Sequence, residues 1–448
     1  MRRIAIALLG ITTLLFHFTA SAQEIQEETA EQKAKRMAWF KDAKLGIFIH
    51  WGIYAVNGID ESWSFFNGYI SHEDYMKQLD SFTAANYDPE AWAKLIKESG
   101  AQYAVITTRH HDGVALWDTQ YGDLSIPKKS AAKRDVLAPF TKALQKNNLK
   151  VGLYYSLSDW SHPDYPLHLR DTYRYKNDPK RWEKYLTYMF GQMEELSTQY
   201  QPDLYWFDGD WEHSAEEWKS KELRQKLLTW RPNVILNSRL QGYGDYATPE
   251  QGVPVTAPKN PYWELCMTMN NSWGHQDNDL NYKTPSQVIR IFIDCITMGG
   301  NLLLDIGPKA DGTIPEQQVH ILKELGRWTN KHKEAIYETI GGIPHGHFYG
   351  PTNLSKDKKT LFLYLLHKPN GPIVIKGLKN KVNRIRIVGN GTKLGHKVIG
   401  KQYWSEVPGL LYIDVPEEDL DPTVTVIALQ LKGEVDLYRE DGKVIESN

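Results

Sequence analysis

The chain is poor in cysteine: its 448 residues include only Cys266 and Cys295. Two cysteines cannot build a thiolate cage for a metal ion, and no His-Glu-x-x-His pattern is present. Both cysteines lie in apolar segments, so the sequence leaves open whether they are buried free thiols or a disulfide.

A strong net charge is also missing. Lysine and arginine number 53, aspartate and glutamate number 55, and the formal net charge is -2. This balance gives no electrostatic basis for binding nucleic acid or an anionic membrane. The sequence has no glycine-rich phosphate loop and no serine or cysteine nucleophile elbow, so it does not indicate nucleotide binding or that type of acyl transfer.

One apolar stretch stands out at the N-terminus. Arg2 and Arg3 precede the apolar residues 4–16, and a run of small residues ends at Ala22. This pattern predicts a secretory signal peptide over residues 1–22. The stretch is too short for a good membrane span, and no nearby cysteine could carry a lipid. We therefore expect an exported protein without a membrane anchor, periplasmic if the source is a Gram-negative bacterium.

From about residue 35 to 345, strand-like and helix-like segments alternate, which indicates parallel βα units. Seven or eight units in about 300 residues favour an α/β fold of the (β/α)8 or TIM-barrel type over an open sheet. We expect strands at 46–52, 103–107, 151–156, 204–207, 233–237, 263–269 and 301–305, and helices from 88 and at 136–147, 181–200, 215–230, 284–298 and 315–338.

After Gly346 the pattern changes to short runs without helical periodicity, which predicts an antiparallel β-sandwich of about 100 residues. We therefore expect a signal peptide (1–22), a catalytic barrel (23–345) and a C-terminal β-sandwich domain (346–448). The expected sandwich strands are 360–366, 373–375, 382–388, 410–415 and 424–429.

Polar and aromatic residues follow the expected barrel strands. The clearest case is the apolar run 204–207, which ends in Asp208 and Gly209. The carboxyl ends of barrel strands meet at one rim and line one pocket. The other strand ends carry His50, then Arg109 with His110 and His111, Tyr154 with Tyr155, Asn237 with Arg239, Trp263 with Glu264, and Asp305.

Acids, imidazoles and aromatic rings around one pocket are typical of glycoside hydrolysis. A retaining glycosidase needs a nucleophilic carboxylate and an acid/base carboxyl about 5 Å apart. Asp208 is the candidate nucleophile and Glu264 the first candidate acid/base, with Asp277 and Asp279 as alternatives. The 15 Trp and 25 Tyr give weak support for a carbohydrate ligand.

Metal-dependent hydrolysis is the competing chemistry. His50, His110, His111 and Asp208 are residue types that could ligate zinc. Metal-binding barrel hydrolases usually begin with His-x-His on the first strand, where this chain reads Ile-His-Trp. We therefore expect no metal.

Five ordered motifs resemble the α-L-fucosidases of glycoside hydrolase family 29, over roughly residues 35 to 345. The resemblance implies a retaining exo-glycosidase without a cofactor, which releases terminal α-L-fucose from fucosylated glycans and carries a C-terminal β-sandwich. The motifs are the segment from Trp39 to Gly52, Thr108-Arg-His-His-Asp-Gly113, Gly152-Leu-Tyr-Tyr-Ser156, Trp206-Phe-Asp-Gly209 and Gly300-Asn-Leu-Leu-Leu-Asp-Ile-Gly-Pro308.

Carried over residue by residue, the resemblance makes Asp208 the nucleophile that forms the covalent fucosyl-enzyme. It assigns the sugar hydroxyls to three histidines, and it makes Trp206 a pocket wall and Tyr155 or Tyr154 a further contact. The histidines are His50, His110 and His111.

Two departures from the family pattern matter. Many relatives have adjacent Glu-Trp after the first strand, where this chain reads Glu61-Ser62-Trp63, so Glu61 and Trp63 are sugar contacts by a one-residue shift or have been replaced. Some relatives carry Arg a few residues after the Trp-Glu pair, where this chain has Met267. Subgroups also place the acid/base at the position of Glu264 or of Asp279, and the shorter reach of aspartate favours Glu264.

One of three tryptophans, Trp63, Trp206 or Trp273, is expected to pack against the sugar's methyl group. Two alternatives stay open: a related glycosidase that prefers α-L-galactose-like sugars, and a secreted sugar-binding protein whose catalytic site has decayed.

Overall fold

The computed structural model of the chain describes residues 28–167 and 173–439. The predicted signal peptide lies outside these residues and stays a prediction. A parallel sheet of seven strands, in the order β5-β4-β3-β2-β1-β7-β6, forms the centre. The strands are β1 (Leu45–Ile49), β2 (Tyr103–Arg109), β3 (Lys150–Ser156), β4 (Leu204–Asp208), β5 (Ile235–Leu236), β6 (Glu264–Thr268) and β7 (Asn301–Ile306).

An irregular extended segment, residues 246–250, joins the two edges of this sheet. Tyr246 forms a parallel bridge with Asn237, just after β5, and Glu250 forms one with Cys266 in β6. The backbone N–H of Cys266 donates to the carbonyl of Pro249 at 3.1 Å. The N–H of Gln251 makes the return bond to the Cys266 carbonyl at 2.9 Å. Pro249 itself has no N–H to donate, which interrupts the hydrogen-bond ladder and keeps this segment from forming a regular strand. The segment fills the eighth position, and the predicted (β/α) barrel is confirmed.

Helices cover the outside of the barrel, and side-chain caps mark the starts of two helices that the sequence predicts. The Asp88 side chain accepts from two backbone N–H groups at the start of α4, with Pro89 as the first helical residue. Thr284 and Gln287 form a capping box at the start of α9. The helices are α1 (Ala30–Ala43), α2 (Trp63–Phe66), α3 (His72–Met76), α4 (Pro89–Glu98), α5 (Ile126–Lys129), α6 (Leu137–Lys146), α7 (Pro179–Glu195), α8 (Ser220–Trp230), α9 (Pro285–Thr297) and α10 (Glu316–Lys331).

Alternate residues of each barrel strand face the interior, because successive side chains of a strand point to opposite faces. Trp206 and Tyr154 belong to the cluster that fills the barrel. Asp208, two residues after Trp206, therefore faces the same way. Tyr155 packs in the other cluster, between the sheet and the surrounding helices.

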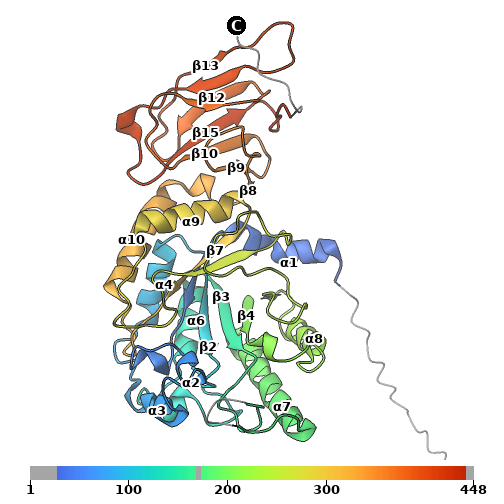
Figure 1. The fold of residues 1–448 in the computed structure, drawn as a ribbon, viewed down its shortest axis with the longest axis vertical. Coiled ribbons are helices and arrows are strands. Elements are labelled where there is room, and N and C mark those ends of the chain that lie inside the picture. The colour runs from blue at the N-terminus through green and yellow to red at the C-terminus, as the bar shows by residue number, and fades with distance from the viewer. Residues whose placement is uncertain (1–27, 168–172, 440–448) are drawn as a thin grey trace, which may run out of the picture.

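The C-terminal region forms two antiparallel sheets with a hydrophobic core of their own, as predicted for a β-sandwich. Figure 1 shows them at one end of the molecule beyond α9 and α10, with α2 and α3 at the opposite end. In α10, Trp328 Nε1 donates to the carbonyl of Val424 at 2.9 Å. One sheet is β12 (Val382–Ile387), β15 (Thr425–Leu431), β10 (Thr360–Leu365), β9 (Thr352–Ser355) and β8 (Thr339–Gly341), and the other is β11 (Ile373–Ile375), β14 (Leu410–Ile413) and β13 (His396–Ile399).

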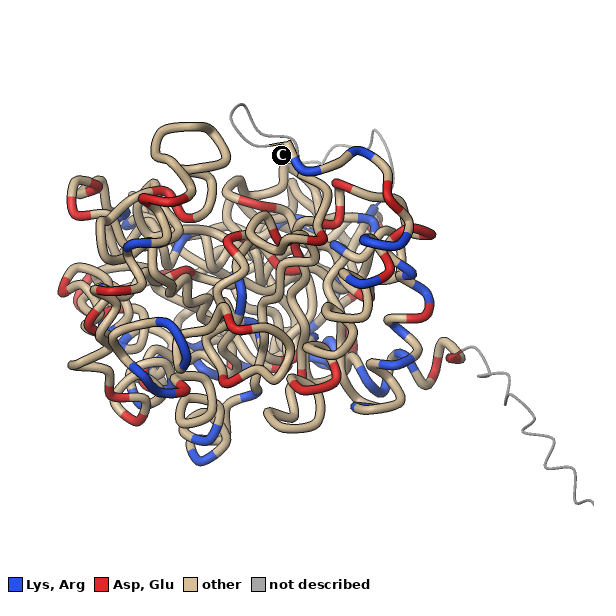
Figure 2. The backbone as a smooth tube through the Cα atoms, turned by 90° about the horizontal axis from the view of Figure 1, so that it is seen from below, with Lys and Arg blue, Asp and Glu red and all other residues tan. Residues whose placement is uncertain are grey.

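Cys266 and Cys295 are both buried free thiols, which settles the alternative left open by the sequence. Among residues 28–167 and 173–439, no helix combines the length and the hydrophobicity that crossing a membrane requires. Figure 2 shows acidic and basic positions interspersed over the molecule, as the small net charge suggests.

Candidate active site

A cavity of about 230 Å³ lies at the carboxyl ends of the barrel strands. Asp208 is the last residue of β4, and His50 and His110 directly follow β1 and β2. The predicted convergence of polar strand ends on one pocket is therefore observed. The lining residues are Phe48, His50, Glu61, Trp63, His110, Tyr154, Trp206, Asp208, Trp211, Arg239, Glu250 and Trp273.

Asp208 is held by hydrogen bonds on both carboxylate oxygens. The Arg239 guanidinium donates to Oδ1 at 2.7 Å, and the Tyr154 hydroxyl donates to Oδ2 at 3.0 Å. Gly209 then turns the chain with φ of 74°, and a Cβ there would meet Ser158 Oγ at 2.4 Å. A glycine at this position thus lets the backbone leave the strand sharply while Asp208 stays aimed into the cavity.

Arg239 also contacts a second carboxylate, that of Glu250. Its Nη2 donates to Glu250 Oε2 at 2.5 Å, and its guanidinium stacks over the Trp206 ring at 4.4 Å. One guanidinium can bridge only carboxylates that lie close together, and the short spacing needed for retention is about 5 Å. The Glu250 side chain is 40% exposed against 12% for Asp208, so Glu250 is on the open side of the pair.

The histidines of the site are buried and neutral. Burial lowers the pKa of His50 and His110 well below the usual value, and it lowers the pKa of His111 to about 3. His50 Nδ1 lies 2.7 Å from Asp305 Oδ1, and His110 Nδ1 lies 2.6 Å from Ser62 Oγ. In each ring Nε2 is the nitrogen left for other partners.

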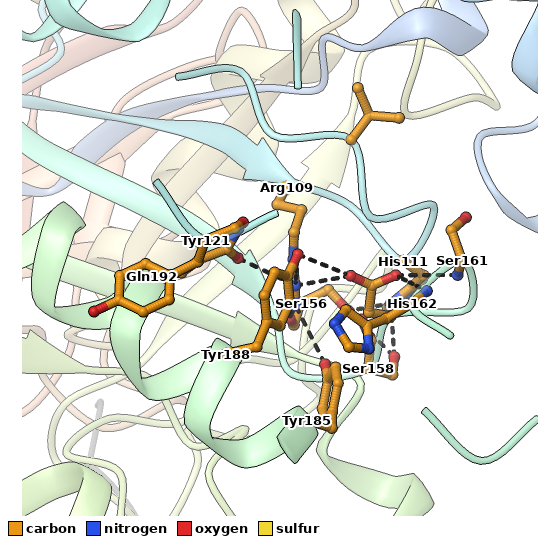
Figure 3. A network of polar contacts seen from close by, with 12 residues as sticks. Arg109, His111, Tyr121, Ser156, Ser158, Ser161, His162, Tyr185, Tyr188 and Gln192 are labelled. Atoms are coloured by element: carbon orange, nitrogen blue, oxygen red, sulfur yellow. Dashed lines mark hydrogen bonds and ion pairs between the residues drawn. The ribbon is translucent and has the colours of Figure 1, made fainter. Parts of the chain in front are cut away.

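His111 is behind Asp208 and is not among the residues that line the cavity. Its Nδ1 lies 2.5 Å from Ser156 Oγ, and its Nε2 lies 3.6 Å from Asp208 Oδ2. Arg109 is a buried neighbour that pairs with Asp159 at 3.0 Å and donates to the Ser156 carbonyl at 2.5 Å. Figure 3 shows this network, which joins the ends of β2 and β3 to α7.

Glu61 and Trp63, the two residues of the Glu-Trp pattern that Ser62 separates here, both line the cavity. Glu61 accepts the backbone N–H of Gly274 at 2.5 Å, and burial raises its pKa to about 7. The Trp63 ring lies nearly parallel to that of Trp211, with an interplanar angle of 13° and centroids 6.5 Å apart. The spacing of two residues therefore removes neither side chain from the pocket.

Glu264, the predicted acid/base, lies at the wrong end of its strand. It is the first residue of β6, fully buried, and accepts hydrogen bonds from the Tyr103 hydroxyl and from Trp206 Nε1, the latter at 3.1 Å. Burial raises its pKa to about 7. Because Trp206 lines the cavity and Glu264 does not, this position argues against the prediction.

Three further predicted residues also lie away from the cavity lining. Tyr155 faces the helices, where its hydroxyl donates to Gln192 at 2.8 Å, so Tyr154 is the tyrosine of the pocket. Asp277 is exposed and lies 2.9 Å from His275 Nε2. Asp279 accepts from the Asn271 backbone at 2.8 Å and from the Ser272 hydroxyl at 2.7 Å.

Sequence reasoning did not assign roles to Glu250, Arg239 and Trp211. The sequence placed Arg239 at a strand end but gave it no role. Glu250 follows Pro249 in a segment without a strand pattern, and Trp211 is half-exposed in a short 3₁₀ turn, Asp210–Glu212. In the described part of the chain, no group of three or more His, Cys, Asp or Glu residues is arranged to hold a metal ion.

A parallel barrel with two bridged carboxylates, histidines and tryptophans around a rim cavity has the architecture of a retaining glycoside hydrolase. Residues 13–334 match the family model described as Alpha-L-fucosidase. An α-L-fucosidase from Dictyostelium discoideum is 31% identical over 336 residues, covering 67% of this chain and 71% of that protein. Tissue α-L-fucosidase from Homo sapiens is 32% identical over 327 residues, covering 67% and 69%.

Solved structures agree. α-L-Fucosidase isoenzyme 1 from Paenibacillus thiaminolyticus is 34% identical with a TM-score of 0.81, covering 89% of this chain and 99% of that chain. A family 29 α-L-fucosidase from Bacteroides thetaiotaomicron is 27% identical with a TM-score of 0.78, covering 89% and 95%. The chain belongs to the α-L-fucosidase family, glycoside hydrolase family 29, which confirms the resemblance.

Proposed function

We propose that the protein is a retaining exo-glycosidase that releases terminal α-L-fucose, with Asp208 as nucleophile and Glu250 as acid/base. The observation that carries this proposal is the bridge from Arg239 to both carboxylates at the cavity. It provides two carboxyl groups at short range, as the double-displacement reaction requires.

In the first step, Asp208 attacks the anomeric carbon while protonated Glu250 gives its proton to the leaving glycosidic oxygen. The bond to the aglycone breaks as the bond to Asp208 forms, which gives a covalent fucosyl-enzyme. In the second step, Glu250 takes a proton from water, the water oxygen attacks the anomeric carbon, and the Asp208 carboxylate is released. Each of the two displacements inverts the anomeric configuration, so the overall reaction retains it.

The donors on Asp208 support its role. Arg239 and Tyr154 both donate to the carboxylate, and such preorganised donors hold it oriented for attack. Tyr154 itself stays protonated, because burial and the charge of Asp208 raise its pKa well above the usual value.

The shape and lining of the cavity support a terminal sugar as substrate. The small volume of the cavity suits one sugar ring. Hydrogen bonds to the sugar's hydroxyl groups can come from His50, His110 and Glu61. Apolar faces for a methyl group are offered by the indoles of Trp63, Trp206 and Trp273. The partners we propose are fucosylated oligosaccharides or glycoconjugates. The predicted signal peptide supports an exported, periplasmic location.

The test is trapping of the intermediate. The Bacteroides thetaiotaomicron relative forms a trapped covalent intermediate with 2-fluoro-fucosyl fluoride. The same reagent with this protein should label Asp208, as seen by mass spectrometry of the peptide, and Asp208→Ala should not be labelled. A label on another carboxylate would contradict the assignment. Sugar binding without label or turnover would support the decayed-site alternative, and faster hydrolysis of an α-L-galactoside than of an α-L-fucoside would change the proposed sugar.

A further inference from the structure

Asp305 comes from the motif Gly300–Pro308, which the proposed reaction leaves without a role. It is the penultimate residue of β7, pairs in register with Phe48 of β1 and is 1% exposed. Its Oδ1 lies 2.7 Å from Nδ1 of His50, a ring that lines the cavity. Asp305 thus contacts the substrate pocket through the His50 ring.

The charged groups around the pair do not supply a cation for Asp305. Glu61 and Tyr54 interact electrostatically with Asp305, and His110, Asp208 and Arg239 interact electrostatically with His50. Arg239 already binds two other carboxylates. Burial and the nearby charge of Glu61 raise the pKa of Asp305 well above the usual value, while burial lowers that of His50. A buried carboxyl without a cationic partner is neutralised by a proton.

We propose that Asp305 is a positioning residue whose carboxyl keeps its proton and donates it in a hydrogen bond to His50 Nδ1, so that the cavity-side Nε2 carries a hydrogen. His50 then donates to a hydroxyl oxygen of the bound sugar. This inference rests on the proposed function for the identity of the sugar. The protonation state itself is a property of the free protein.

His111 provides an internal contrast. The Ser156 hydroxyl donates to the Ser158 carbonyl at 2.6 Å, so toward His111 it can only accept. His111 Nδ1 therefore carries the hydrogen and Nε2 is a bare acceptor. That atom is buried, has no hydrogen-bond partner in the described residues and lies beside Asp208. The site thus has one imidazole donor and one imidazole acceptor, set by Asp305 and Ser156.

The Asp305–His50 pair carries one dissociable proton. Its loss changes His50 Nε2 from a hydrogen-bond donor to an acceptor. When the Asp305 carboxyl ionises, the ring hydrogen moves to Nδ1, where it is held by the carboxylate, and Nε2 becomes an acceptor. Binding of the sugar hydroxyl then loses its donor. The proposed effect is a fall in kcat/KM of the free enzyme as pH rises.

The direct test is 15N NMR of the full chain labelled at histidine, without ligand and at about pH 6. His50→Gln identifies the His50 signals, and His111 serves as reference in the same spectrum. We expect His50 in the Nε2–H form and His111 in the Nδ1–H form. A His50 ring protonated at Nδ1, or at both nitrogens, at this pH would overturn the proposal.

Kinetics give a second, independent readout. Asp305→Asn keeps the shape and an N–H donor but has no proton to lose, so the alkaline fall in kcat/KM assigned to the pair should disappear. Asp305→Ala should raise KM about tenfold, the effect of one hydrogen bond, with a smaller change in kcat. If Asp305→Ala does not fold, the kinetics of Asp305→Asn and the 15N spectrum of the unsubstituted protein still test the proposal. An unchanged alkaline fall in Asp305→Asn would contradict the proposal.

The two proposals fail in distinguishable ways. A protein with the expected His50 and His111 spectra that does not hydrolyse α-L-fucosides refutes the proposed function and leaves the role of Asp305 intact. A protein that hydrolyses them but shows His50 protonated at Nδ1 refutes only the role of Asp305.

Discussion

Glu264 accepts a hydrogen bond from the indole of Trp206 at 3.1 Å, so the buried acid supports the floor of the pocket from inside the barrel. Parallel strands place their first residues at the end of the barrel opposite the catalytic rim, and Glu264 is the first residue of β6. Its role in this account is to hold Trp206.

Glu264→Gln should therefore keep most of the activity. A glutamine oxygen can accept from Trp206 Nε1, and its amide N–H can donate to the Tyr103 hydroxyl, which keeps both contacts although the direction of the second bond is reversed. We expect kcat/KM on an aryl α-L-fucoside within about fivefold of the original at about pH 6, since exchanging a satisfied hydrogen bond costs about 1 kcal/mol. A loss of several hundredfold would restore Glu264 as a catalytic candidate.

The same substitution should change how stability depends on pH. The pKa of Glu264 rises from 4.5 to about 7 on burial, so its contribution is fully present below 4.5 and is lost as pH rises through about 7. The measurement is urea unfolding of the original protein and of Glu264→Gln at about pH 5.5 and about pH 8. Because both proteins contain the same histidines, the comparison separates the titration of Glu264 from theirs. From about pH 5.5 to about pH 8, the free energy of unfolding of the original protein should fall by about 2 kcal/mol relative to that of Glu264→Gln. A constant difference would mean that Glu264 does not titrate in this range.

The adjacent tyrosines of β3 form a matched pair. Tyr154→Phe removes a donor to the Asp208 carboxylate, and losing a hydrogen bond to a charged group should lower kcat/KM by about 10- to 100-fold. Tyr155→Phe removes a bond to Gln192 on the outer side and should cost about 1 kcal/mol of stability while changing kcat/KM by less than about twofold. Steady-state kinetics and thermal unfolding of both variants test this. Equal losses of activity would contradict the assignment of the inner face.

Arg239→Lys tests the bridge between the carboxylates. A lysine keeps the positive charge but lacks the planar fork that contacts two acids at once. We expect a fall in kcat of about 10- to 100-fold, which corresponds to about 1.5 to 3 kcal/mol of lost stabilisation. Ser238→Ala, one residue away and facing Thr248 at 3.2 Å, is the control and should retain kcat. Unchanged kcat in Arg239→Lys would show that the bridge has no part in the reaction.

Much of this site is predictable from local sequence because the chemistry follows strand ends. An apolar run that stops at Asp208 and Gly209 marks a rim, and the same reasoning finds His50 and His110. Periodicity also places the interior face of β4, but two adjacent tyrosines in β3 cannot be assigned to faces until the register is known. The choice between Tyr154 and Tyr155 therefore required the structure.

Glu250, the acid/base that we propose, was harder to find because its segment has no strand signature. Residues 246–250 take the place of a strand through isolated bridges to two neighbours, and Pro249 prevents the regular hydrogen-bond pattern. Glu264 instead lies in a segment with a strong strand pattern, which made it the first candidate from the sequence. Position along the strand, with its first residue far from the rim, was the signal that could have excluded it.

The most direct test of the account is azide rescue of Glu250→Ala and Asp208→Ala, with an aryl α-L-fucoside as substrate and NMR of the fucosyl azide produced. In Glu250→Ala, azide should attack the fucosyl-enzyme and give the α-azide, whereas in Asp208→Ala it should attack the substrate and give the β-azide. The account is contradicted if azide does not rescue Glu250→Ala while Glu264→Ala loses activity and yields the α-azide.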